Sequence, residues 1–245
     1  EPHAKEFFAE QKDLSNLPAR ISPWREKCKR LKDNNVDYAF FLRFNKKLQN
    51  MTPENFIDNI LSKLNIKYLM VGDDFKFGKE RSGDFDFLSN WGQNNKIEVD
   101  RVPTYSFDDR RVSSTWIRES IAEGDFELAE KLLDRRYTFS GKVVSGNKLG
   151  RTIGIPTANI WVPKSNLPIR GVYAVKAFLK GETFNGIANM GVRPTVGGTS
   201  PVLEIHIFDF NKNIYGQRIE VEFYKKIREE KKFNDLNELK DQISK

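Results

Sequence analysis

The chain has 245 residues, and its composition of 38% hydrophobic and 12% aromatic residues is that of a folded globular protein rather than a disordered one. No apolar run approaches the roughly 20 residues that span a bilayer, and the single cysteine, Cys28, excludes an intrachain disulfide and favours a reducing, cytoplasmic location. The formal net charge of +7 permits either a nucleic acid or an anionic small molecule as partner.

From residue 22 to residue 134, strand patterns and helix patterns alternate. Ser22 as N-cap and Pro23 at the first helical position predict a helix in "SPWREKCKRLKD", and "TPENFIDNILSKL" repeats this signal with an apolar face that ends at Leu64. Apolar runs predict buried strands at 38–42 and 68–71, and a further strand covers 96–102. Two consecutive helices follow, in "SSTWIRESIAEG" and "DFELAEKLLDR". The alternation predicts a parallel sheet with helices on both faces and ligands beyond the carboxyl ends of its strands.

After about residue 136 the pattern changes to one of period two. Five segments read as strands separated by Gly, Pro and Asn turns, namely "YTFSGKVV", "GVYAVKAFL", "TFNGIANM", "VLEIHIFDF" and "IEVEF". They predict an antiparallel sheet or barrel closed by a final helix with Leu236, Leu239 and Ile243 on one side. We therefore expect two domains, 1–135 and 136–245.

Two motifs of the first half carry candidate ligand-binding groups. "VGDDFKFG" (71–78) follows an apolar strand, so its acidic and aromatic side chains would meet a planar ligand at the strand end. A tight turn with two buried phenylalanines is the alternative, and residue types alone favour it. "SSTWIR" (113–118) places hydroxyls, free amides and Arg118 at a helix start, which suits a polyphosphate as well as it suits an ordinary N-cap.

The segment "GKVVSGNKLGRTIGIPTANI" (141–160) supplies glycines and bases but matches neither of the two common glycine-rich phosphate fingerprints. In an extended "PTANI", Thr157 and Asn159 point to the same face, and their oxygens are hard ligands suited to Mg²⁺ with phosphates. A polar strand face in solvent is the alternative.

Two further segments of the second half add a carboxylate and a cation. In "VLEIHIFDF" (202–210), Glu204 lies on the polar face and is able to accept a proton, although a surface glutamate paired with a lysine is the more common reading. His206 is expected to orient or pack rather than to bind a ligand. The glycine-rich loop around Arg193 would close over a phosphate or ring, or form a surface hairpin.

Taken together, and in order along the whole chain, these motifs resemble those of the bifunctional prokaryotic riboflavin kinase/FAD synthetase family. The front half is similar to the nucleotidylyltransferase lobe through "EPHAKEFF", "VGDDFKFG" and "SSTWIR". The back half is similar to the flavokinase barrel through "GRTIGIPTANI", "GVYAV", "NMGVRPTVGG" and "LEIHIFDF". The resemblance implies an α/β nucleotidylyltransferase-type, Rossmann-like N-terminal domain, truncated at its start, and an antiparallel β-barrel flavokinase domain with a terminal helix.

The resemblance also implies a two-step activity. The barrel would phosphorylate riboflavin to FMN with Mg²⁺ and ATP, and the front lobe would adenylylate FMN to FAD with release of pyrophosphate. The partners expected are riboflavin, FMN, FAD, ATP and ADP, with no nucleic acid and no membrane, and the chain is expected to be a monomer or weak homo-oligomer.

The implied site residues fall into four groups. For the kinase they are the base Glu204, the ATP-binding residues Gly146, Lys148, Gly150, Arg151, Gly154, Pro156, Thr157 and Asn159, of which Thr157 and Asn159 also bind Mg²⁺, and the flavin-binding residues Asn189, Arg193 and Glu204. For the adenylyltransferase they are His3, Ser114, Thr115 and Arg118 for ATP, and Asp73, Phe75 and Phe77 for the flavin.

The chain departs from the family pattern in one respect. The family's upstream Gly-x-Phe-Asp-Gly-x-His-x-Gly-His loop does not occur in it, since the only histidines are His3 and His206 and the sequence opens without methionine. We therefore expect the numbering to start inside a domain, and adenylyltransferase activity is not expected of the chain as it stands.

Two rival hypotheses remain open from the sequence. The first is a flavokinase whose front lobe only binds nucleotide. The second is a basic nucleic-acid-binding protein, which would need clustered Lys and Arg with interleaved aromatics; here the bases are spread along the chain.

Overall fold

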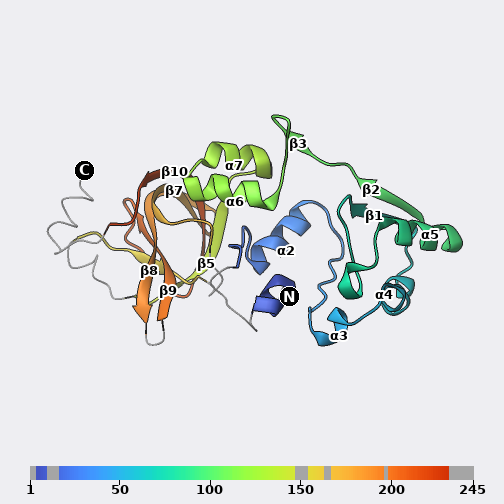
Figure 1. Cartoon of the computed structure of the whole chain (residues 1–245). Helices are drawn as coiled ribbons and strands as arrows, with labels where there is room; N and C mark the ends of the chain where they lie inside the picture. The colour runs from blue at the N-terminus through green and yellow to red at the C-terminus, as the bar shows by residue number, and fades with distance from the viewer. Residues whose placement is uncertain (1–3, 10–16, 147–153, 163–166, 196–197, 232–245) are drawn as a thin grey trace. The chain divides into compact units, whose positions relative to one another are not determined.

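The computed structural model describes residues 4–9, 17–146, 154–162, 167–195 and 198–231 (Figure 1). The chain divides into two compact units that do not follow chain order. The first unit contains Glu1–Leu17 and Tyr38–Val112, and the second contains Pro18–Asp37 and Ser113–Lys245. The segment 18–37 therefore groups with the second half of the sequence.

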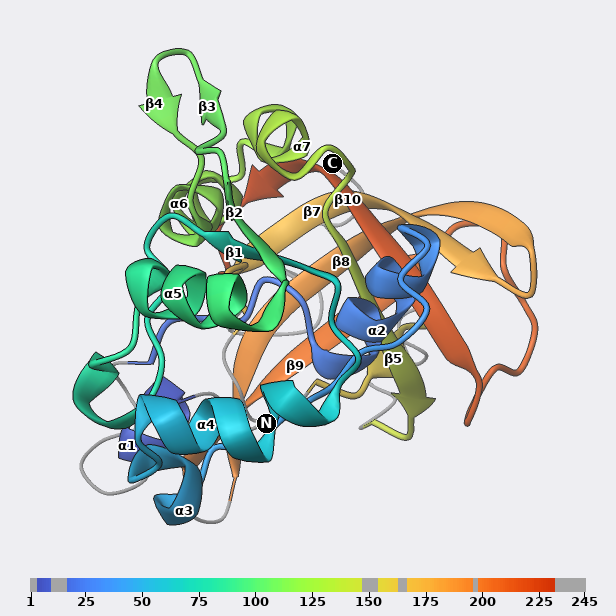
Figure 2. The same ribbon diagram turned by 90° about the vertical axis from the view of Figure 1, so that its right-hand side faces the viewer.

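The first unit contains a small parallel sheet. β1 (Tyr68–Gly72) pairs in parallel with β2 (Glu98–Val102), and β3 (Ser106–Phe107) forms a short antiparallel ladder with β4 (Arg110–Arg111). The helices are α1 (Ala4–Ala9), α3 (Lys46–Gln49), α4 (Pro53–Asn59) and α5 (Phe85–Asn95), with 3₁₀ turns at Leu61–Lys63 and Lys79–Arg81. α5 runs beside β1 and β2 in both views (Figures 1 and 2).

A compact apolar cluster holds this unit together. Its buried members are Ile57, Val71, Phe77 and Leu88, from α4, β1, the turn after β1, and α5. The predicted start of α4 is confirmed, because Pro53 stands at the first helical position and the Thr52 hydroxyl accepts a hydrogen bond from the Asn55 amide at 3.3 Å. The helix breaks at Ile60, so Leu64 lies beyond it and is exposed.

Two expectations for the first unit are wrong in detail. The segment 38–42 is not a strand, and its apolar side chains are exposed, Tyr38 to 83% and Phe40 to 72%. Within the described residues, the parallel sheet of the first unit consists of β1 and β2, and the segment 38–42 is not part of it. An apolar composition alone does not make a strand, because the backbone groups of a strand also need a neighbouring strand to pair with. In β1 only Val71 is fully buried, whereas Tyr68 and Met70 are exposed.

The second unit is built on a closed antiparallel barrel, as the sequence predicts. Its strands are β5 (Thr138–Val144), β6 (Ala158–Ile160), β7 (Gly171–Leu179), β8 (Glu182–Thr195), β9 (Gly198–Ile207) and β10 (Arg218–Arg228), in the order β10-β5-β6-β9-β8-β7. The alternate residues Leu203, Ile205 and Ile207 of β9 are buried inside, while Glu204 and His206 face outward. The predicted terminal helix with Leu236, Leu239 and Ile243 lies outside the described residues.

Three helices pack on the barrel within the second unit, namely α2 (Trp24–Asp33), α6 (Ser114–Glu123) and α7 (Phe126–Leu133). Phe126 of α7 is buried against the rings of Tyr137, Tyr173 and Phe223, at centroid distances of 6.3, 5.6 and 5.9 Å. α6 ends at Gly124, whose φ of +83° favours glycine. A side chain there would also meet Lys226 Cβ at 2.6 Å, so the end of α6 approaches β10 closely.

α2 lies beside β5 in both views (Figures 1 and 2). Its Glu26 is almost fully buried, forms an ion pair with Arg30 at 2.7 Å, and accepts a hydrogen bond from Thr138 at 3.0 Å. The predicted cap is displaced by one residue: α2 starts at Trp24 after Pro23, and the Ser22 hydroxyl accepts a hydrogen bond from Arg135 instead of capping the helix.

Candidate active site

Three residues predicted from three separate motifs lie side by side on the outer face of the barrel. In the strand register, Asn159 of β6 is directly opposite Glu204 of β9, and Glu204 is directly opposite Asn189 of β8. Side chains at directly opposite positions share one face and lie with their Cβ atoms about 5 Å apart. The arrangement therefore places one carboxylate between two amides.

Gly146, two residues after β5, lies against one member of this row. Gly146 approaches Asn159 so closely that a Cβ on Gly146 would lie 2.3 Å from the Asn159 Nδ2 atom. Asn159 is consequently buried although it points outward. Asn189 carries a buried Oδ1 atom with no hydrogen-bond partner among the described residues.

Thr157 stands just before β6, and His206 supports this segment. The His206 Nδ1 atom lies 2.9 Å from the carbonyl oxygen of Pro156, so the ring donates there when Nδ1 carries the proton. The ring also packs edge-on against Phe208, at 5.6 Å between centroids. His206 therefore orients the chain at Thr157, as the sequence predicts for a residue that is not a ligand.

A pocket of about 690 Å³ opens next to Thr157 at one mouth of the barrel. Its wall is formed partly by inward-facing Ile205 and Ile207 and partly by the turn after β9, including Phe210, Lys212 and Tyr215. The sequence does not predict these turn residues because a turn carries no periodic signal, although "FDFNKNIYG" contains three aromatic residues and two asparagines.

The donor set at the barrel face suits a magnesium ion. Mg²⁺ usually takes one or two protein oxygens and completes its shell with water and phosphate. The Thr157 hydroxyl and the Asn159 amide oxygen are hard donors of this kind, and the close approach of Gly146 holds the amide in place. Among the described residues, no three His, Cys, Asp or Glu side chains gather into a metal-binding cluster.

Several predicted residues cannot be placed. His3, Lys148, Gly150 and Arg151 lie outside the described residues, as does the side chain of Arg193 within β8. Gly154, at a φ of +78°, forms a turn in open space, and Pro156 is exposed.

In the first unit, Asp73 is held at the carboxyl end of β1. Its carboxylate accepts hydrogen bonds from Thr104 at 2.5 Å and from Arg111 at 2.8 Å. The bond from Thr104 holds the pKa of Asp73 below its usual value. Phe77 is a core residue with its ring stacked at 5.7 Å on that of Phe75, which is partly buried. Phe77 therefore matches the alternative interpretation of a tight turn with buried rings.

The predicted polyphosphate residues lie at the start of α6. Ser113 caps the helix by accepting a hydrogen bond from the Trp116 amide at 3.2 Å, which leaves the hydroxyls of Ser114 and Thr115 exposed. Arg118 donates from Nε to the Ala19 carbonyl at 2.6 Å and from Nη1 to the Ser114 carbonyl at 2.9 Å. These residues belong to the second unit, whereas Asp73, Phe75 and Phe77 belong to the first.

Comparison with known proteins gives two family models that divide the chain. The model described as "Riboflavin kinase" matches residues 133–245, and the model described as "FAD synthetase" matches residues 1–116. The bifunctional riboflavin kinase/FMN adenylyltransferase of Haemophilus influenzae is 45% identical over 247 residues, covering 100% of this chain and 79% of the relative. The protein of the same name from Escherichia coli K12 is 42% identical, covering 100% of this chain and 77% of the relative.

The chain belongs to the bifunctional riboflavin kinase/FMN adenylyltransferase family. The predicted family and fold class are thereby confirmed, as is the predicted function at the level of the family, a transferase of flavin cofactor biosynthesis. Members of this family use ATP as co-substrate.

A solved structure also resembles the chain. A crystal structure described as a macrolide-efflux protein from Streptococcus pneumoniae has a TM-score of 0.78 and 31% sequence identity, and the match covers 94% of this chain and 77% of that one. In the described part of the present chain, no helix has both the length and the apolar composition that a membrane span requires.

Proposed function

We propose that the barrel of the second unit transfers the γ-phosphate of ATP to the 5′-hydroxyl of riboflavin, with Glu204 as the general base. The observation that carries this proposal is the strand register, which sets Asn159, Glu204 and Asn189 side by side on one face. Glu204 takes the proton of the hydroxyl, the hydroxyl oxygen bonds to the γ-phosphorus, and the bond from that phosphorus to the bridging oxygen breaks to release ADP.

The neighbours of Glu204 have separate roles in this proposal. Thr157 and Asn159 hold Mg²⁺ and the phosphates, and Asn189 binds the flavin. When bound, Mg²⁺ neutralises charge on the transferring phosphoryl group, and phosphoryl transfer depends mainly on such positioning and charge neutralisation. We place the nucleotide in the pocket of about 690 Å³, because Thr157 lines its wall.

The first test replaces Glu204 by Gln. Removal of a general base usually lowers turnover by about 10²- to 10⁴-fold, so kcat for FMN formation should fall in that range while riboflavin still binds. Glu222→Gln is the matched control, since Glu222 is an outward-facing carboxylate of β10 in the same barrel. Near-normal turnover of Glu204→Gln would show that another group is the base.

We also propose that the motifs of residues 1–116 take part in adenylylation of FMN to FAD. The FAD synthetase family model and the bifunctional relatives support this step. Incubation of FMN and ATP with this chain, and separately with a protein that also carries the upstream histidine-rich loop, should give FAD and pyrophosphate with the latter. If neither protein forms FAD, the alternative function is favoured, a flavokinase whose front lobe only binds nucleotide.

We propose a cytoplasmic enzyme that is a monomer or weak homo-oligomer. The free thiol of Cys28, which is partly buried on α2, fits a reducing compartment.

A further inference from the structure

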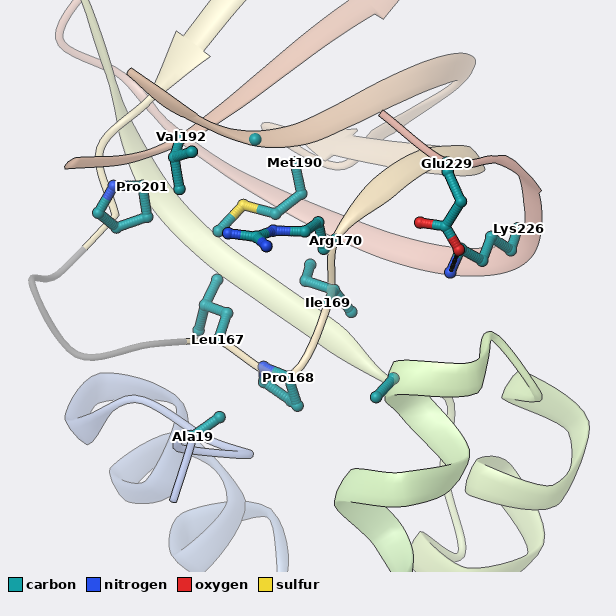
Figure 3. Close-up of a pocket in the computed structure, with 12 residues that line it drawn as sticks. Ala19, Leu167, Pro168, Ile169, Arg170, Met190, Val192, Pro201, Lys226 and Glu229 are labelled. Carbon is teal, nitrogen blue, oxygen red and sulfur yellow. Dashed lines mark hydrogen bonds and ion pairs between the residues drawn. The ribbon is translucent and has the colours of Figure 1, made fainter. Parts of the chain in front are cut away.

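A second pocket, of about 480 Å³, lies in the second unit, at a mouth of the barrel (Figure 3). It shares no lining residue with the pocket beside Thr157. In the strand register Val192 pairs with Pro201 and Met190 with Leu203, and these positions alternate with Asn189 and Glu204. The pocket is therefore on the face of β8 and β9 opposite to that of Glu204. Because it also shares no lining residue with the pocket beside Thr157, it is separate from the proposed kinase site.

The lining of this pocket combines apolar side chains with polar groups. Leu167, Ile169 and Met190 are buried side chains that form its base, and Val192 and Pro201 add to one wall. Ala122 of α6 and Ala19 line other parts, and their single methyl groups leave the space between them open. A volume of about 480 Å³ lies within the range, about 300 to 1,000 Å³, of pockets that take small ligands.

Two of the three charged side chains that line the pocket form an ion pair with each other. Lys226 Nζ and Glu229 Oε1 are 2.6 Å apart, so these two charges neutralise each other. The Arg170 backbone is held by Tyr173, whose hydroxyl accepts from the Arg170 amide at 2.9 Å and donates to the Arg170 carbonyl at 2.6 Å. Within the described part of the chain, the Arg170 guanidinium has no hydrogen-bond or ion-pair partner. Figure 3 shows its side chain extending between Met190 and Leu167.

We propose that this pocket binds a small amphipathic monoanion, with its apolar ring or chain in the barrel mouth and its one anionic group on Arg170. The apolar base has no charged side chain to neutralise a second anionic group. The guanidinium supplies a fork that suits a carboxylate, sulfonate or phosphate. Because Arg170 precedes β7 and its backbone is fixed by Tyr173, the cation is presented from a rigid element.

The test compares two dyes with the same apolar body. 1-Anilinonaphthalene-8-sulfonate carries one sulfonate, and N-phenyl-1-naphthylamine carries none. Both dyes are titrated by fluorescence against the full chain, without MgADP and with saturating MgADP. Fluorescence that MgADP abolishes is assigned to the pocket beside Thr157, and the fluorescence that remains measures binding to the second pocket. Arg170→Gln should weaken the sulfonate dye at least about tenfold, the loss expected for one charge-assisted contact, and change the neutral dye less than about twofold.

Two further variants complete the design. Lys142→Gln, which removes an exposed cation of β5, should bind both dyes like the unaltered chain. Ala122→Trp, which fills the pocket from an exposed position of α6, should weaken both dyes at least about tenfold. The proposal is overturned if Arg170→Gln leaves the affinity of the sulfonate dye within about twofold or weakens both dyes equally. It is also overturned if a folded Ala122→Trp binds both dyes normally.

Discussion

Glu204 and Asn189 are neighbours across β8 and β9. Burial of the Asn189 amide costs free energy of folding, because its acceptor oxygen, Oδ1, makes no hydrogen bond among the described residues. A buried acceptor without a partner costs about 1–3 kcal/mol. Such a group is retained where a ligand satisfies it, which is the role proposed for Asn189 with the flavin.

Asn189→Leu should separate stability from activity. The free energy of unfolding should stay equal or rise by about 1 kcal/mol, because the unsatisfied acceptor is removed, while kcat/KM for riboflavin falls at least about tenfold. Urea denaturation and steady-state kinetics measure the two quantities. Asn185→Leu, at an exposed position on the same face of β8, is the control and should keep its activity. If Asn189→Leu lowers the free energy of unfolding but keeps full turnover, Asn189 stabilises the fold and does not bind the flavin.

Tyr173 makes stability sensitive to alkaline pH. Burial raises its pKa to about 12, and burial likewise raises the pKa of Tyr137. Between pH about 10 and about 12 the unfolded chain releases the Tyr173 proton and the folded chain keeps it, so the free energy of unfolding falls as pH rises, by about 1.4 kcal/mol per pH unit at most for this tyrosine. The stabilisation is fully present below pH about 10.

The variant Tyr173→Phe should show a shallower fall than the unaltered chain. Urea denaturation at pH values from about 9 to about 11.5 gives the slope for each. Tyr38→Phe, at a tyrosine that is 83% exposed, should leave the slope unchanged. Equal slopes for Tyr173→Phe and the unaltered chain would contradict the assignment.

At the scale of elements, β6 depends on the chain that covers it. β6 has only three residues, and its Asn159 is fixed by the approach of Gly146, where a Cβ would lie 2.3 Å from Nδ2. Gly146→Ala should therefore displace the Asn159 amide and lower kcat/KM for MgATP by at least about tenfold, since a 1 Å misplacement at a catalytic centre can cost about a hundredfold. Ser145→Ala, at the preceding exposed position, is the control. Equal kinetics for the two variants would exclude a role of Gly146 in holding Asn159.

The elements also show what periodicity can and cannot predict. The five barrel strands with alternating patterns were predictable because one face of each strand is buried in the barrel, as Leu203 and Ile205 of β9 show. The segment 38–42 has strand composition but does not form a strand of any sheet among the described residues, and it is exposed. Phe210 and Tyr215 of the pocket beside Thr157 lie in a turn, where no period exists.

For the candidate site, spacing predicted which residues share a face but not which strands are neighbours. The side-by-side placement of Asn159 and Glu204 depends on the pairing of β6 with β9, which are separated by β7 and β8 in the chain. No local pattern encodes that pairing. The family resemblance implied only that these residues belong to one site, and the strand register now shows Asn159 and Glu204 at directly opposite positions.

At the scale of the molecule, the barrel is stabilised by a helix from far upstream in the sequence. Glu26 of α2 is 2% exposed, and it pairs with Arg30 and accepts from Thr138 of β5. Lys29 adds an ion pair to Glu220 of β10 at 2.5 Å. The contacts with Thr138 and Glu220 join residues 112 and 191 positions apart.

Glu26→Ala should destabilise the barrel by about 3–5 kcal/mol, because it removes the buried partner of the partly buried Arg30 charge. Hydrogen exchange should then become faster at the amides of β5 and β10. Asp33→Ala removes the exposed partner of Arg30 at 3.5 Å and should cost less than about 1 kcal/mol. Unchanged exchange in β5 and β10 of Glu26→Ala would show that α2 contributes nothing to barrel stability.

The division of the chain into units implies a particular covalent topology. The polypeptide crosses between the two units after Leu17, after Asp37 and after Val112, so each unit is built from two separate segments that alternate along the chain. A cut at the predicted boundary between 135 and 136 would sever α2, α6 and α7 from the barrel on which they pack. The segments of the two compact units are thus interleaved along the polypeptide, whereas the two family models follow each other in chain order.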